Sequence, residues 1–111
     1  MQSTRQQKIE HLIQKDLGDI FLNYTRRLHG TLISVSEVRI SPDLSIAHIY
    51  LSVFPNERQQ EVFELIVEET SKIRGELGRK ERFQLRIIPE LNFHLDDTLN
   101  RLEHIDELLH S

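Results

Sequence analysis

The spacing of apolar residues switches from a helical to a strand-like period near residue 30, and this switch limits the possible folds more than any other feature. Up to residue 24, apolar side chains recur every three or four positions, as on one face of an amphipathic helix. These residues are Ile9, Leu12, Ile13, Leu17, Ile20, Phe21 and Tyr24. Further on, two stretches rich in Val and Ile flank Ser41-Pro42-Asp43-Leu44, a typical turn sequence. The sequence therefore predicts a long helix followed by a β-hairpin.

The first strand of this hairpin, residues 32–40, contains a change of parity. Ile33 and Val35 share one parity, whereas Val38 and Ile40 share the other. This pattern indicates either a β-bulge near residues 36 and 37 or burial of both faces of the strand. The return strand, residues 45–53, alternates regularly, and its predicted core face carries Ala47, Ile49, Leu51 and Val53.

The next segment predicts one long helix with a kink in its middle. Asn56 with Gln59 three residues later is typical of a helix start, and we expect the helix to end around Gly78. The apolar stripe consists of Val62, Phe63, Ile66, Val67, Ile73 and Leu77. It is interrupted at Glu69-Thr70-Ser71, where Thr and Ser side chains can bond to backbone carbonyls and bend the helix.

The last part of the chain predicts a long strand and then a short acidic helix. Most odd-numbered residues from Phe83 to Leu95 are apolar, and Pro89 among them indicates a sheet edge or a bend. The expected core includes Phe83, Leu85, Ile87 and Phe93, together with Val53 and Ile66. Asp97 or Thr98 should begin the acidic helix, whose apolar residues are Leu99, Leu102, Ile105 and Leu109. The order of elements predicts an α+β fold with helices on one face of a sheet.

Composition narrows the classes of function. The 111 residues fit one domain, and 38% hydrophobic residues suffice for one core. The chain has no cysteine, so disulfides, thiolate metal sites and a cysteine nucleophile are excluded. Its six histidines are scattered, and Asp96-Asp97 is better explained by helix capping than by acid–base chemistry. We expect no enzyme activity, cofactor, metal, membrane association or small-molecule substrate, and a cytoplasmic location.

The net charge of −4 conceals one basic segment between acidic ones. Residues 72–86 carry six basic side chains against two Glu, a balance of +4, whereas residues 57–69 carry five Glu against one Arg. Such a segment is typical of an anion-binding face, although a solvated helix surface explains it equally well. The candidate phosphate-binding residues are Lys72, Arg74, Arg79, Lys80, Arg82 and Arg86, with Arg39 a weaker candidate. Few exposed aromatic residues accompany them, which favours contacts to an RNA backbone over base stacking.

A Gly-x-x-Gly sequence, Gly75-Glu76-Leu77-Gly78, matches the backbone clamp of KH domains. Glu76 would repel a phosphate, and the helical stripe requires Leu77 in the core. We therefore do not interpret this sequence as a working clamp.

Two longer stretches resemble the ribosome-binding factor A family. The first is the hairpin of residues 34–47, SVSEVRISPDLSIA, and the second is residues 85–98, LRIIPELNFHLDDT. Ile73-Arg74 with Leu77-Gly78 is similar to the family's third-helix segment, and residues 101–109 are similar to its tail. The resemblance covers nearly the whole chain.

The resemblance implies a KH-like type II domain, with the order α-β-β-α-kink-α-β, over residues 1–111 and a helical tail at residues 98–111. It also implies a non-enzymatic factor that binds the small (30S) ribosomal subunit and its 16S rRNA. We expect the free protein to be monomeric. Such factors assist late maturation, including processing of the rRNA 5′ end, and are associated with growth in the cold. The family's Ala-x-Gly kink is replaced here by Glu69-Thr70-Ser71. The alternative is a protein–protein interaction module that docks through the acidic helix at residues 99–109.

Overall fold

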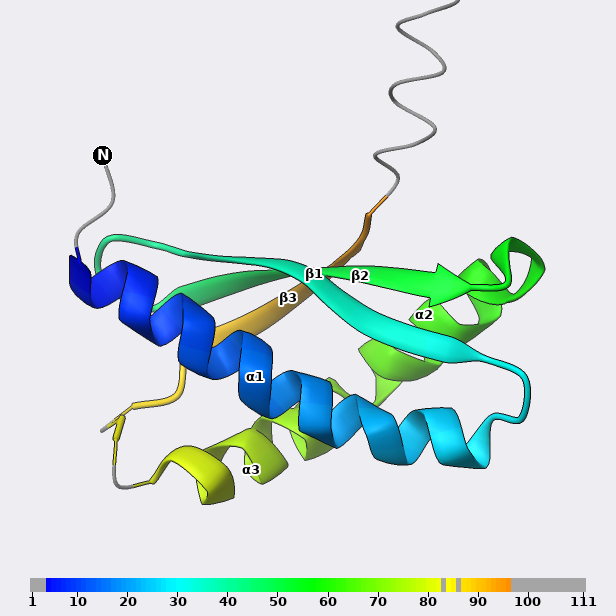
Figure 1. The fold of residues 1–111 in the computed structure, drawn as a ribbon. Coiled ribbons are helices and arrows are strands. Elements are labelled where there is room, and N and C mark those ends of the chain that lie inside the picture. The colour runs from blue at the N-terminus through cyan, green and yellow to red at the C-terminus, as the bar shows by residue number, and fades with distance from the viewer. Residues whose placement is uncertain (1–3, 83, 86, 97–111) are drawn as a thin grey trace, which may run out of the picture.

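The computed structural model describes residues 4–82, 84–85 and 87–96, which form one sheet with helices packed on it (Figure 1). The elements are α1 (Thr4–Arg27), β1 (Leu32–Ile40), β2 (Ile46–Phe54), a short 3-10 helix (Asn56–Arg58), α2 (Gln59–Glu68), α3 (Thr70–Glu81) and β3 (Glu90–Leu95). Within these described ranges, no helix is both long and apolar enough to cross a membrane. The helix and docking surface predicted for residues 98–111 lie outside the described residues.

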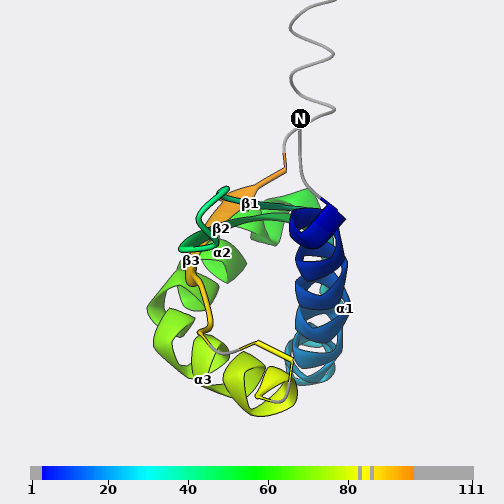
Figure 2. The ribbon, with the colours of Figure 1, turned by 90° about the vertical axis from the view of Figure 1, so that its left-hand side faces the viewer.

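The sheet has the strand order β1-β2-β3. β1 and β2 are antiparallel, as expected for a hairpin, whereas β2 and β3 are parallel because the α2–α3 segment connects them. Figure 2 shows the helices on the same side of the sheet. This arrangement confirms the predicted α+β class and is consistent with the KH-like order of elements.

The core lies between the sheet and the helices α1, α2 and α3, and β2 contributes to it as its alternation predicts. Ala47, Ile49, Leu51 and Val53 are all buried. In β1 the pairing register shifts between Val35 and Glu37, which confirms the bulge. Because the bulge changes the parity, Ile33 before it and Val38 and Ile40 after it are all buried.

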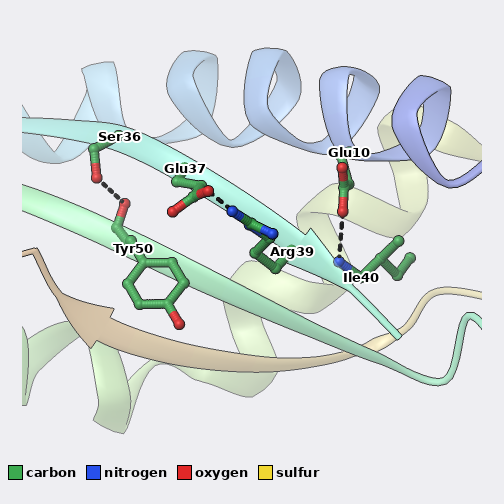
Figure 3. A network of polar contacts seen from close by, with 6 residues as sticks. All are labelled: Glu10, Ser36, Glu37, Arg39, Ile40 and Tyr50. Atoms are coloured by element: carbon green, nitrogen blue, oxygen red, sulfur yellow. Dashed lines mark hydrogen bonds and ion pairs between the residues drawn. The ribbon is translucent and has the colours of Figure 1, made fainter. Parts of the chain in front are cut away.

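Polar side chains of α1 cover the free edge of β1. Glu10 accepts a hydrogen bond from the backbone N–H of Ile40 at 2.9 Å (Figure 3). Gln6 donates to the Ile40 carbonyl at 3.2 Å. Gln14 donates to the carbonyl of Val35 at 3.1 Å. These backbone groups of an edge strand are therefore satisfied by a helix instead of by water or another strand.

The predicted long helix is two helices that meet at Glu69, whose φ of −94° and ψ of 13° separate α2 from α3. The hydroxyl of Thr70 donates to the carbonyl of Val67 at 2.7 Å, a local bond that competes with regular helix pairing. The Glu69 carboxylate accepts a hydrogen bond from the hydroxyl of Tyr24 in α1. Burial, followed by the contact with Glu69, raises the pKa of Tyr24 to about 12, so its phenol stays protonated. The hydrogen bond between Tyr24 and Glu69 therefore connects the α2–α3 junction to α1.

Two predicted boundaries in this region are wrong. α3 does not end near Gly78 but continues to Glu81, because Gly78 keeps a helical conformation. The predicted strand from residue 83 is restricted to β3, which starts at Glu90. Buried Pro89 cannot donate to a ladder, and the segment before it is not paired with β2.

Some of the residues expected in the core are buried in the structure, and others are not. Val53, Ile66 and Phe93 are buried, which confirms their assignment. Leu85 is only partly buried, and Ile87 is 78% exposed, so its assignment to the core is wrong. Phe83 lies outside the described residues.

Candidate nucleic-acid interface

The described cations of the basic segment lie mainly on the outward face of α3. Helical spacing of seven and three residues places Lys72, Arg79 and Arg82 on one stripe, and Lys80 lies at its flank. All four side chains are exposed. From Lys72 to Arg82 they extend over eleven residues, roughly 15 Å at the helical rise, which is long enough to contact several phosphates. We call these four residues the α3 cation stripe.

Arg74 is on the same helix but has a different environment. Its guanidinium donates to the carbonyl of Pro89 at 3.0 Å and to the carbonyl of Ile88 at 2.5 Å. These two bonds tie α3 to the segment that enters β3. Arg74 therefore supports the fold with two of its donors, a role for which its sequence position gave no signal.

Arg39 lies apart from α3, on the face of the sheet that the helices leave open. Its Nε lies 2.6 Å from a carboxylate oxygen of Glu37, and this contact raises the pKa of Arg39 further. The seven predicted cations therefore do not form one cluster. Arg86 lies outside the described residues.

Glu81 is the last residue of α3 and lies on its inward side. Its side chain is fully buried and lies beside the carboxylate of Asp16. Burial, followed by the neighbouring Asp16, raises the pKa of Glu81 to about 8, so the group is neutral at pH 7. The four-residue spacing of Ile73, Leu77 and Glu81 could have revealed this.

The Gly-x-x-Gly sequence lies inside α3 and not in a loop between helices. Leu77 within it is fully buried. Its backbone amides are therefore part of a regular helix, in agreement with the interpretation that it is not a clamp.

The structure also brings together two histidines that are 46 residues apart in the sequence, His48 of β2 and His94 of β3. Sequence reasoning treated them as scattered, because their contact depends on the register of two parallel strands. No group of three or more potential metal-ligating side chains occurs in residues 4–82, 84–85 and 87–96.

Comparison with known proteins gives consistent results. A family model described as Ribosome-binding factor A matches residues 5–109. A protein named ribosome-binding factor A from Cytophaga hutchinsonii is 44% identical over 110 residues, covering 98% of this chain and 83% of that protein.

Two structures show the same fold. The crystal structure of ribosome-binding factor A from Thermus thermophilus has a TM-score of 0.66 at 22% identity, covering 81% of this chain and 94% of that one. A homology model of the Thermus thermophilus protein, fitted into a cryo-electron microscopy map of a 30S–RbfA complex, has a TM-score of 0.63 at 22% identity. That alignment covers 78% of this chain and 90% of the fitted one.

Proposed function

Because this chain belongs to the ribosome-binding factor A family, we propose that it is a ribosome assembly factor that binds the small (30S) ribosomal subunit. It contacts the 16S rRNA and assists late maturation of the subunit, including processing of the rRNA 5′ end. It acts in the cytoplasm as a monomeric, single-domain protein and catalyses no reaction itself. The observation that carries this proposal is the family match across residues 5–109, and the 30S complex of the Thermus thermophilus relative supports it.

The α3 cation stripe supplies the chemistry of docking. Lys72, Arg79, Lys80 and Arg82 are exposed and contact RNA phosphates without reading bases. Arg86 joins them in this proposal. Arg74 acts first by holding the segment before β3, and Arg39 remains a weaker candidate because Glu37 neutralises it.

The proposal is tested by sedimenting the protein with purified small subunits, large subunits and an unrelated RNA across a salt series. We expect retention on small subunits that weakens steeply with salt, with a log–log slope of about −3 or steeper for four or more neutralised phosphates. Equal retention on all three partners would indicate a generic RNA binder and would contradict the proposal.

The double variant Arg79→Glu/Lys80→Glu tests the interface itself. We expect it to lose most binding to the small subunit, because two phosphate contacts become repulsive. The matched control is Lys8→Glu/Lys15→Glu, which makes the same change of charge on exposed positions of α1. Circular dichroism checks folding, since negative charges near the end of α3 cost about 0.3–1 kcal/mol each. If the α1 variant loses binding and the α3 variant retains it, the assignment of the face is wrong.

Deletion of residues 98–111 separates this proposal from the alternative of docking through an acidic helix. RNA-mediated binding to the subunit should survive the deletion. A helix-mediated partnership should be abolished by it.

A further inference from the structure

The open face of the sheet holds a pair of histidines that the proposed function does not use. The Nδ1 of His48 and the Nε2 of His94 are 3.0 Å apart, and the ring centroids are 5.2 Å apart. In the parallel pairing of β2 and β3, His48 lies beside Asn92, and His94 lies beside Tyr50. The two histidines are therefore diagonal neighbours on one face, held by backbone register.

We propose that His48 and His94 form a two-histidine binding site for a borderline divalent cation such as Zn²⁺, Ni²⁺ or Cu²⁺. Imidazole nitrogens are favoured ligands of these ions. At a metal–nitrogen distance near 2.0–2.1 Å, two ligands at angles between a right angle and the tetrahedral angle lie about 2.9–3.4 Å apart. The observed separation of 3.0 Å falls in this range.

Tyr50 limits the orientations that the ring of His94 can take. The ring of Tyr50 stacks on His94, with centroids 5.0 Å apart and planes at 24°, and this restricts the orientation of the imidazole.

Metal binding needs no net loss of a proton from the pair. In the metal-free chain, one of the two facing nitrogens carries a proton and shares it, in a hydrogen bond, with the lone pair of the other. Transfer of that proton to the second nitrogen of the same ring leaves lone pairs on both Nδ1 of His48 and Nε2 of His94. The cation then replaces the hydrogen bond between the two side chains.

The charged residues near the two histidines carry no net charge that would repel a cation. Arg39 lies opposite His48 in the β1–β2 pairing, and Glu37 lies opposite Tyr50. Figure 3 shows Arg39 and Glu37 paired with each other, so their charges cancel locally. Since the described residues offer no third ligating side chain, water completes the coordination. The bound ion links β2 to β3 through side chains, beyond their backbone pairing.

The test is isothermal titration of the full chain with Zn²⁺, Ni²⁺ and Cu²⁺ separately, and with Mg²⁺ as an ion that does not favour imidazole. We expect 1:1 binding of the first three ions and none of Mg²⁺. His48→Gln and His94→Gln should each weaken Zn²⁺ binding at least about tenfold. Loss of a residue that only supports a metal ligand typically weakens metal binding by about that factor, so loss of a ligand itself should cost no less. His11→Gln/His29→Gln and His104→Gln/His110→Gln are the matched controls and should keep the affinity of the unaltered chain. Unchanged binding by the His48→Gln/His94→Gln variant would overturn the proposal.

A second measurement needs no variant. Paramagnetic Cu²⁺ at substoichiometric concentration should broaden the imidazole proton signals of His48 and His94 before those of the other four histidines. Zn²⁺ should also raise the thermal midpoint of the unaltered chain, because only the folded state holds the two rings together. Broadening that begins at any other histidine would contradict the assignment.

Discussion

The inward and outward faces of α3 differ in burial, in charge and in the partners that each can have. Ile73, Leu77 and Glu81 on the inward face are completely closed to solvent, whereas the α3 cation stripe is exposed. The inward face carries one titratable group, and burial keeps it neutral at pH 7. This difference predicts that stability depends on the inward face of α3, and that binding through the α3 cation stripe depends on the outward face. A substitution on one face should change one property and leave the other nearly unaltered.

The largest effect on stability is expected from a substitution that opens a cavity on the inward face of α3. We expect Leu77→Ala to lower the free energy of unfolding by about 2–5 kcal/mol, because Leu77 is fully buried. Urea unfolding followed by circular dichroism measures the loss. Ile87→Ala, at a position 78% exposed, is the control and should change stability by less than about 0.5 kcal/mol. Equal effects of the two substitutions would show that α3 is not packed as described.

A second test uses the proton on Glu81. The folded-state pKa of about 8 lies above the ordinary value of 4.5, so between these values the folded chain keeps a proton that the unfolded chain loses. The contribution of this group to the free energy of unfolding should therefore fall as pH rises from 4.5 to 8, by up to about 1.4 kcal/mol per pH unit.

The Glu81→Gln variant lacks this titration. Its free energy of unfolding should fall less between pH 4.5 and 8. As pH rises, the variant should therefore become more stable relative to the unaltered chain. Thermal unfolding at a series of pH values gives both curves. Parallel curves would mean that Glu81 is not held in its neutral form.

The smallest expected effect distinguishes two arginines of α3, Arg74 and Arg79. Arg74→Gln should cost about 1 kcal/mol of stability, because its bonds to the carbonyls of Ile88 and Pro89 are lost. Arg79→Gln, five residues later on the outward face, should leave stability nearly unchanged and weaken binding to the small subunit. The reverse assignment of these two effects would contradict the description of both side chains.

Much of the fold could be predicted from the sequence, because its local signals agree with one another. The alternation in β2, the turn that begins at Ser41, and the parity change in β1 all correspond to observed features. The helix break was predictable because the apolar stripe is interrupted where Glu69 separates α2 from α3.

The remaining features depend on contacts between distant residues. Ile87 has the parity of a strand, yet the chain before Pro89 is held by Arg74 and is not paired with β2. The proximity of His48 and His94 depends on strand register, which composition and spacing do not contain. The basic segment was visible in the sequence, but the different environments of Arg74 and Arg79 were not.

The side chains that α1 places along β1 also determine where another chain could add to this sheet. An exposed strand edge can template the addition of a foreign strand, and such addition leads to aggregation. Here Gln6, Glu10 and Gln14 already occupy backbone groups of β1, so an incoming strand would have to displace a packed helix. Strand addition from a second copy or from an extended peptide is thus directed away from β1. In the described part of the chain, the other edge of the sheet is formed by β3.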